Sequence, residues 1–226
     1  MATWPWPYNG YYTSMLLESR AVAPFFKNGF VLGCEETCEA AIVDPGDEVE
    51  DLLAFVAEHH LEVKHILLTH AHVDHVSGVA RARRALGAPV YLHPEDLPLY
   101  DAADRQARFF GLSVEAPPRV DRTYVEYPEL RFGRYVVRAH HTPGHSPGGV
   151  CLQVGQDGSA GRDLFVGDTL FAGSIGRTDL PGGDYPTLIR SIREVLFAFG
   201  DEAKVYPGHG PRTTIGEERR TNPFLQ

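Results

Sequence analysis

A stretch of six residues, HAHVDH at positions 70–75, concentrates side chains that can bind a metal ion. It follows directly on the apolar run Ile66-Leu67-Leu68, and it contains three histidines and one aspartate: His70, His72, Asp74 and His75. Imidazole and carboxylate groups gathered this closely would repel and desolvate one another unless a cation neutralised them. The stretch therefore predicts a metal site at the end of a buried strand.

Three further polar clusters occur later in the chain, each where an apolar segment gives way to a turn. They are HTPGH (141–145), Gly167-Asp168 and Gly208-His209-Gly210. Since turns after neighbouring strands can meet in one crevice, we expect all of them to contribute to the site begun by HAHVDH. Histidine and carboxylate ligands suit zinc, iron or manganese, and no cysteine is needed.

The spacing within HAHVDH favours two metal ions over one. His70 and His72 are two residues apart, so in an extended segment they point the same way. A turn after them can swing Asp74 and His75 toward a neighbouring point. The two carboxylate oxygens of Asp168 could bridge the two ions.

The elements expected to position these clusters alternate between strand and helix. Strands are predicted at 30–32, 40–43, 66–69, 90–92, 135–139, 149–154, 164–167 and 205–206. Helices are predicted at 49–56, with a capping box from Asp47 to Glu50, at 77–86 and at 188–199, and 94–118 should hold a loop with a helical piece. Two sheets packed together with helices outside would bury this many short strands, although the pattern alone also fits a doubly wound sheet.

Length and composition restrict the classes of protein. The 226 residues suit one α/β domain, expected over 15–226, after a loosely ordered tail at 1–14 rich in aromatics and proline. The net charge is −9 and the basic residues are dispersed, which argues against nucleic acid or membrane as a partner. The chain has neither an apolar run of about 20 residues nor a signal peptide, and its three cysteines read as reduced thiols of a cytoplasmic protein.

The motifs resemble the metallo-β-lactamase superfamily of metallohydrolases over roughly residues 20–226. HAHVDH matches its His-x-His-x-Asp-His signature, and HTPGHSPG, FVGDTLF and YPGHG match its later ligand motifs in order. The resemblance implies an α/β fold, an αββα sandwich of two mixed β-sheets flanked by helices. It also implies that His70, His72 and His145 hold one divalent ion, that Asp74, His75 and His209 hold a second, and that Asp168 bridges them. Zinc is the first candidate, with iron or manganese as alternatives, and Asp44 in VDPGD would support the site without binding metal.

A narrower resemblance to small glyoxalase II-like hydrolases lies in GSIGRTDLPGGD (173–184) and YPGHGPRTTIGEERRTNPF (206–224). It implies hydrolysis of glutathione-type thioesters such as S-lactoylglutathione by a hydroxide shared between two metal ions, with Asp74 orienting that hydroxide. The expected partner is a small acyl-thiol, and the oligomeric state is left open. Arg177 falls where larger members of the family place a lysine near the substrate carboxylate, so it is a substrate-binding candidate. A salt bridge from Arg177 to Asp179 or Asp184 is an equally good interpretation.

Other functions remain open at this point. Persulfide dioxygenases of the same superfamily also contain a GRTD segment, and in them one iron is held by the equivalents of His70, His145 and Asp168. Lactam or lactone hydrolysis, or metal binding without turnover, fits the residues less well. Among the other histidines, His93 and the pair His59-His60 are expected to be structural or solvated, and His141 to support the His145 loop by a hydrogen bond.

Overall fold

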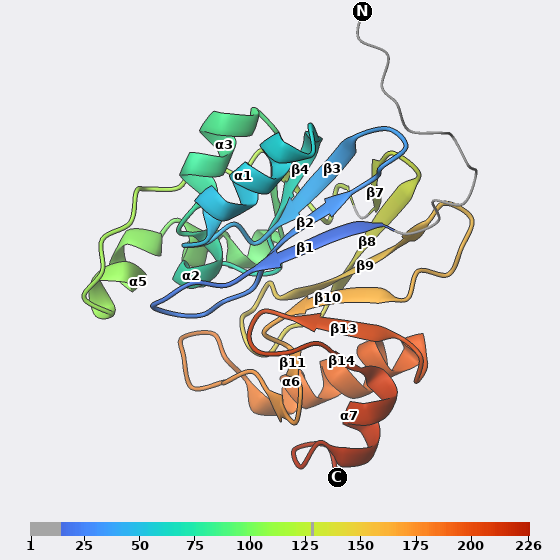
Figure 1. The fold of residues 1–226 in the computed structure, drawn as a ribbon. Helices are drawn as coiled ribbons and strands as arrows, with labels where there is room; N and C mark the ends of the chain where they lie inside the picture. The colour runs from blue at the N-terminus through green and yellow to red at the C-terminus, as the bar shows by residue number, and fades with distance from the viewer. Residues whose placement is uncertain (1–14, 128) are drawn as a thin grey trace, which may run out of the picture.

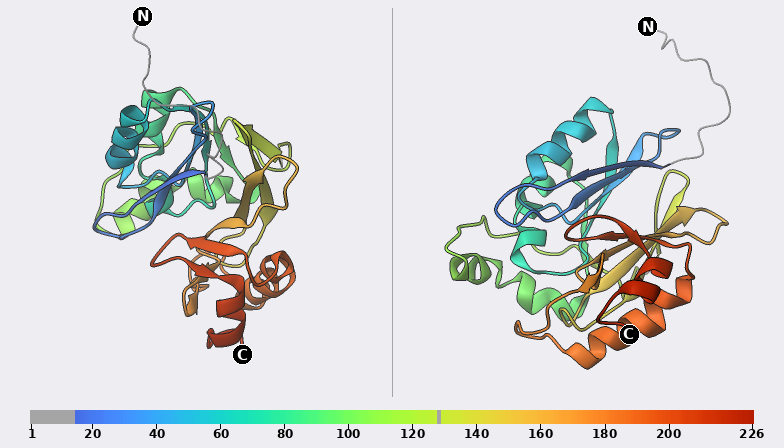
Figure 2. Two further views of the ribbon diagram at one scale, coloured as in Figure 1. Left: turned by 45° about the vertical axis from the view of Figure 1, so that its right-hand side comes forward. Right: turned by 60° about the horizontal axis from the view of Figure 1, so that its bottom comes forward.

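Two β-sheets of six strands each face one another, and helices cover the outer side of both (Figures 1 and 2). The computed structural model describes residues 15–127 and 129–226, so the expected loose tail at 1–14 lies outside the described residues, and the division into a tail and one domain stays a prediction. The four layers confirm the predicted αββα sandwich of mixed sheets.

The first sheet is built from the N-terminal half of the chain. Its order is β1 (Leu16–Arg20), β2 (Gly29–Gly33), β3 (Glu39–Val43), β4 (Glu62–Leu67), β5 (Val90–Leu92) and β6 (Arg122–Thr123). The first three strands pair antiparallel, and the rest pair parallel. The connecting helices are α1 (Val49–Glu58), α2 (Val73–Val76), α3 (Val79–Leu86), the 3-10 turn η1 (Pro94–Asp96), α4 (Leu97–Tyr100) and α5 (Ala103–Phe109).

The second sheet comes from the C-terminal half. Its order is β14 (Thr213–Thr214), β13 (Lys204–Pro207), β10 (Asp163–Gly167), β9 (Val150–Gln156), β8 (Tyr135–His141) and β7 (Glu129–Phe132). Only β10 and β13 pair parallel. A small hairpin, β11 (Leu170–Phe171) and β12 (Ser174–Ile175), follows β10. The helices on this side are α6 (Tyr185–Arg190), the π-helical η2 (Ser191–Val195), the 3-10 η3 (Leu196–Phe199) and α7 (Ile215–Thr221).

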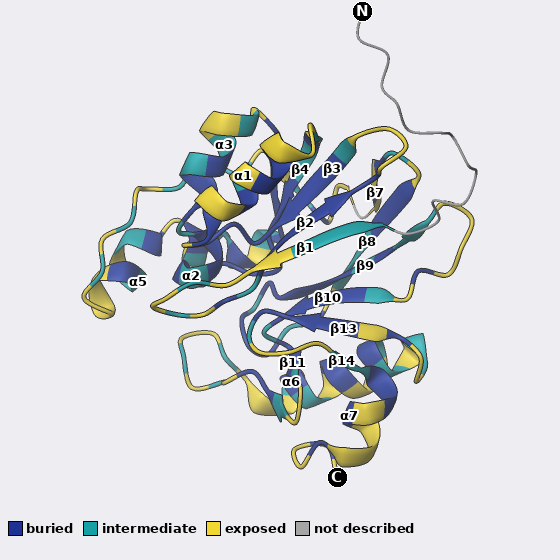
Figure 3. Ribbon diagram, viewed as in Figure 1, coloured by how far each residue is buried: buried dark blue, intermediate teal, exposed yellow. Residues whose placement is uncertain are grey.

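Alternation of side chains along the strands fills three apolar layers. In β2, Phe30 and Leu32 face the second sheet, whereas Val31 packs toward the helices α1 and α3. On the far side, Leu188 and Ile192 pack on the outer face of the second sheet. Figure 3 shows the result, with buried strands between helices whose outer faces are exposed. Because both faces of most strands are buried, the sequence reads as apolar runs.

Several boundaries differ from the sequence expectation. The strand expected at 66–69 begins at Glu62 and ends at Leu67, which leaves the residues after it free to turn into the site. The predicted capping box of α1 is wrong: Asp47 accepts a hydrogen bond from Ser77 and Glu50 pairs with Arg81. The elements β1, β7 and α7 were not predicted, since short edge strands and a short charged helix carry little apolar periodicity. Among the described residues, no helix is both long enough and apolar enough to cross a membrane.

Candidate metal centre

The HAHVDH segment begins in a loop and ends in a short helix. After β4 ends at Leu67, the chain bends at Thr69 and is extended at His72, whose φ and ψ are −71° and 150°. Helix α2 starts at the next residue and turns the remaining ligands toward a different point. This change of backbone direction separates the pair His70 and His72 from the pair Asp74 and His75, as the spacing predicted.

The three histidines predicted to hold one ion lie together. His70, His72 and His145 each offer a ring nitrogen within 4.8 Å of the others. The closest pair is His72 Nδ1 and His145 Nε2, 2.8 Å apart. All three side chains are buried, so their nitrogens converge inside the protein.

The three residues predicted to hold a second ion lie beside the first trio. Asp74, His75 and His209 form a group of the same tightness, with His209 Nε2 3.1 Å from Asp74 Oδ2. Asp168 lies between the two groups. Its carboxylate oxygens are 3.3 Å from His75 Nε2, 3.5 Å from His145 Nε2 and 3.6 Å from His209 Nε2. The structure thus brings all seven sequence-predicted ligands together and places Asp168 between the two groups, and its bridging of two ions stays a prediction.

Several buried atoms of this cluster are poorly satisfied by the protein. His70 Nε2 makes no hydrogen bond, and His75 Nε2 and Asp168 Oδ1 have only each other, 3.3 Å apart. Leaving such atoms unsatisfied is costly, so each points to a missing partner. Imidazole and carboxylate donors converging in this way fit divalent zinc, iron or manganese.

Hydrogen bonds on the far side of three rings select the tautomer that a metal needs. Thr69 Oγ1 donates to Asp44 Oδ2 and can therefore accept from His70 Nδ1, 3.1 Å away. His75 Nδ1 donates to Asp44 Oδ2 at 2.8 Å, and His145 Nδ1 donates to the Arg177 carbonyl at 2.8 Å. Each bond holds a proton on Nδ1, so the neutral form of each ring would present the lone pair of Nε2 to the centre.

The electrostatics of the cluster favour a cation. Burial, reinforced by His145, lowers the pKa of His72 to about 3, and burial lowers the pKa of His70 as well, so both rings are neutral. Burial opposes a charge on His75 too, but Asp74, Asp44 and Asp168 outweigh it and raise its pKa to about 10. The carboxylates that keep a proton on His75 supply negative charge, which a metal ion in place of that proton would neutralise.

Asp44 supports the cluster through hydrogen bonds to Thr69 and His75, which confirms its predicted supporting role. Its carboxylate accepts hydrogen bonds from the Thr69 amide at 2.7 Å and the Thr69 hydroxyl at 2.6 Å, besides the bond from His75. The residue is fully buried at the end of β3. One carboxylate therefore fixes both the start of the ligand loop and the orientation of His75.

Asp96 is a supporting residue that no motif or spacing in the sequence indicated. It lies in η1, within the segment 94–118 whose structure was not predicted in detail. Its buried carboxylate accepts from the Ala71 amide at 2.9 Å, the Ser146 hydroxyl at 2.9 Å and the Gly148 amide at 2.6 Å. Asp96 thus joins the His70–His72 loop to the His145 loop, two segments that come from different sheets.

Glycine is required where the His209 loop approaches the cluster. A Cβ on Gly208 would lie 2.2 Å from Asp168 Oδ1 and 2.7 Å from His75 Cε1. Such distances are far inside van der Waals contact, so any side chain here would displace two of the predicted ligands. The YPGHG motif therefore needs its first glycine for close approach.

His141 and His93 lie outside the seven clustered residues and have structural roles. His141 Nε2 lies 2.8 Å from the Pro147 carbonyl, which confirms its predicted support of the His145 loop. The His141 ring stacks on His93, with centroids 4.0 Å apart and planes 13° apart. Together with Glu95 they form a fourth group of possible metal ligands, but parallel rings direct their lone pairs side by side and not toward a common point.

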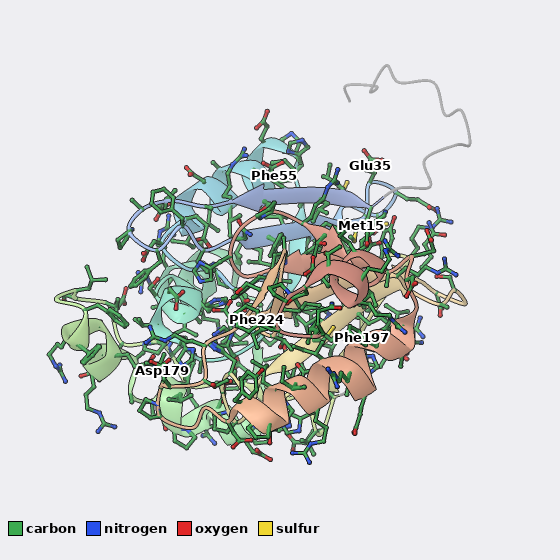
Figure 4. The ribbon with its side chains drawn as sticks, turned by 90° about the horizontal axis from the view of Figure 1, so that it is seen from below. Met15, Glu35, Phe55, Asp179, Phe197 and Phe224 are labelled. Atoms are coloured by element: carbon green, nitrogen blue, oxygen red, sulfur yellow. The ribbon has the colours of Figure 1, made fainter. Side chains whose placement is uncertain are left out.

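Arg177 contributes to the site first through its backbone, whose carbonyl orients His145. Its guanidinium is exposed and forms a two-pronged pair with Asp179, with both N–O distances at 2.7 Å. Figure 4 places Asp179 on the loop beside the start of α6, at the edge of the molecule. The side chain thus makes the salt bridge that was the alternative interpretation, and its role toward a substrate stays a prediction.

Comparison with known proteins agrees with this geometry. The family model described as the metallo-beta-lactamase superfamily matches residues 24–209. Among curated proteins, hydroxyacylglutathione hydrolase GloC of Haemophilus influenzae is 38% identical, and the match covers 93% of this chain and 98% of that protein.

Three solved structures are similar over most of the chain. A B3 metallo-beta-lactamase, BLEG-1, has a TM-score of 0.84 and 37% identity, with 93% of this chain and 100% of that chain covered. TTHA1623, solved in a di-iron-bound form, has a TM-score of 0.80 and 44% identity, with 92% and 100% covered. ETHE1 from Myxococcus xanthus has a TM-score of 0.72 and 28% identity, with 92% and 84% covered.

Replacing Asp96 by alanine is expected to weaken the first metal site. The substitution leaves three buried donors without an acceptor and frees the His70–His72 and His145 loops from each other. We expect about a tenfold to hundredfold loss of affinity for the more tightly bound metal equivalent, measured by chelator competition. The matched control is Glu95→Ala, one residue away and exposed, and equal losses in both variants would contradict the role given to Asp96.

Removing the metal should make stability strongly dependent on pH. The His72 pKa of about 3 lies below the unfolded value of about 6.5, so between these pH values the unfolded chain binds more protons and stability falls as the pH drops. The His75 pKa of about 10 lies above the unfolded value, so its contribution is lost as the pH rises through 10. Urea midpoints of chelator-stripped protein should therefore be highest near pH 6.5, and His72→Gln should flatten the acid side. A pH-independent midpoint would contradict both assignments.

Proposed function

The chain belongs to the metallo-β-lactamase superfamily, and within it we propose that the protein is a metal-dependent hydrolase of glutathione-type thioesters, with S-lactoylglutathione as the reference substrate. The observation that carries the proposal is the complete second trio, Asp74, His75 and His209, beside the first. The similarity to GloC over nearly the full length of both chains supports the same substrate class.

The seven clustered residues would hold two divalent ions, zinc foremost, with iron or manganese as alternatives. Bound metal ions would supply a Lewis acid and lower the pKa of water to near neutrality. The protein contributes position: Asp74 accepts hydrogen bonds through a carboxylate that is 14% exposed, and it can orient an attacking water molecule toward a bound thioester. A thiolate leaves readily, so the reaction requires no strong general acid among the described residues.

Substrate enters from the side of His209. Its side chain is 31% exposed, whereas that of His75 is fully buried, so the cluster opens in one direction. We propose that Arg177 binds the carboxylate of the thiol carrier near this opening. To do so its guanidinium must exchange Asp179 for the substrate, and an exposed pair of this kind is weak enough to be displaced.

Persulfide dioxygenation is the second candidate, favoured by the GRTD segment and the similarity to ETHE1. Lactam hydrolysis is a third candidate, and the similarity to BLEG-1 supports it. The hydrolase is preferred over the dioxygenase because His209 lies 3.1 Å from Asp74 and completes a second group of ligands, which a single iron would not need. We place the enzyme in the cytoplasm, in keeping with its free cysteines, and propose a small acyl-thiol as its partner.

One assay separates these functions. We expect metal-loaded protein to hydrolyse S-lactoylglutathione equally under air and under nitrogen, and Asp74→Ala to reduce kcat by about a thousandfold or more while the protein stays folded. Metal content is measured by elemental analysis of the same sample. Oxygen consumption with glutathione persulfide, in the absence of thioester hydrolysis, would establish the dioxygenase instead. Full thioesterase activity in Asp74→Ala would contradict the role of that residue.

Arg177→Gln tests the binding of the carrier carboxylate. We expect KM for S-lactoylglutathione to rise about tenfold with kcat within a factor of two, because the lost charge acts on binding. Arg134→Gln is the matched control, since Arg134 makes a similar exposed ion pair with Glu36. Asp179→Asn, which releases the guanidinium, should lower KM, and an unchanged KM in both Arg177→Gln and Asp179→Asn would exclude the guanidinium from substrate binding.

A further inference from the structure

Lys27 is a fully buried lysine in a molecule whose other charged groups are mostly exposed. Its Nζ donates to the Asp44 carbonyl and to Glu48 Oε1, and both charged side chains are 1% exposed. An ammonium ion is costly to bury, and replacing a buried ion pair by apolar groups is often neutral or stabilising. Stability alone therefore does not explain the buried pair of Lys27 and Glu48.

We propose that Lys27 is a positioning residue for the second metal ion: it holds in one arrangement the two segments that carry the second trio, helix α2 with Asp74 and His75, and the loop with His209. Each of these segments touches Lys27 or the turn closed around its ammonium group. The proposal concerns the metal site itself and does not depend on which substrate the enzyme uses.

The link to His75 runs through Asp44. The backbone of Asp44 has a φ of 49°, in the left-handed region that residues other than glycine seldom adopt. A hydrogen bond from Lys27 Nζ to the Asp44 carbonyl holds that peptide group in place. In this conformation the Asp44 carboxylate reaches His75 Nδ1 at 2.8 Å and orients the ring.

The link to Asp74 runs through Gly46. Glu48 Oε1 accepts from the Gly46 amide at 2.9 Å as well as from Lys27, so the turn 44–48 is closed around the ammonium group. A Cβ on Gly46 would lie 2.0 Å from the Asp74 carbonyl oxygen and 2.8 Å from Lys27 Cε. The turn is therefore in direct contact with the backbone of Asp74, and a shift of one displaces the other.

The link to His209 is made by the backbone of Lys27, which forms an antiparallel bridge with His209. The next residue, Asn28, donates its amide to the Gly208 carbonyl at 2.6 Å and its side-chain Nδ2 to the carbonyls of Pro207 and Gly210 at 3.0 and 2.8 Å. Anchoring the Lys27 side chain in the turn 44–48 therefore fixes the distance between the His209 loop and His75.

The first trio has a different support. His70, His72 and His145 are held by the bonds of Asp96 to the loops on either side of them, and Lys27 makes none of those bonds. His70 also contacts Thr69, which bonds Asp44, but the Asp96 bonds remain when Lys27 is changed. Loss of Lys27 should consequently affect the second ion much more than the first.

The test is a titration of chelator-stripped protein with cobalt(II) alone, followed by visible absorption and by chelator competition. Two variants are compared with wild type: Lys27→Met, and Lys27→Met with Glu48→Gln. The double variant removes both buried charges while the glutamine oxygen can still accept from Gly46. The matched control is Lys64→Met, which breaks exposed ion pairs to Glu39 and Glu62. Urea denaturation of each protein reports folding separately.

We expect both Lys27 variants to bind the first cobalt equivalent within about threefold of wild type and the second about tenfold to a hundredfold more weakly. In the double variant this loss should persist although the unfolding midpoint returns toward that of wild type, and Lys64→Met should change neither affinity. Recovery of the second equivalent in the double variant would show that only charge burial mattered, and would overturn the proposal. So would equal weakening of both equivalents, or wild-type binding by Lys27→Met.

Discussion

The structure depends on one buried carboxylate that must face three imidazole rings. Asp168 directly follows a strand of the second sheet, His75 lies in helix α2 after a strand of the first, and His145 and His209 lie in two further loops. Each of the three rings nevertheless has a nitrogen within 3.6 Å of a carboxylate oxygen of Asp168. Such a contact is stable only if the strands of both sheets end at the same edge. The αββα sandwich brings these strand ends to one edge. Its three close-packed apolar layers hold the loops at that edge in fixed positions relative to one another.

The ligands could be predicted from sequence because their chemistry is local. His70, His72, Asp74 and His75 stand in one motif, and the residues that join them each follow an apolar run. The supporting residues could not be found in this way. Asp96 has its partners 25, 50 and 52 positions away, and Lys27 bonds positions 17 and 21 away, so neither shows any pattern in its own neighbourhood. The αββα arrangement likewise came from the family resemblance, since periodicity alone left a doubly wound sheet open.

Chemistry and specificity occupy different parts of the molecule. The cluster is buried and rich in supporting hydrogen bonds. The side chain of Arg177, the candidate for substrate binding, is exposed instead and already has a partner in Asp179. Because the hydrogen bonds of Asp44 and Asp96 hold the clustered residues, and Arg177 and Asp179 make no bond to them through their side chains, substitutions at this exposed pair should leave the cluster in place.

The uneven exposure of the ligands has a consequence for the exchange of metal ions. His70 and His75 are enclosed on every side by sheet and helix, so neither ring can swing away without unpacking the core. His209 is the most exposed of the seven, and its loop is the last to join the cluster along the chain. An ion held by the second trio would therefore begin to dissociate at His209 and exchange faster than an ion held by His70, His72 and His145.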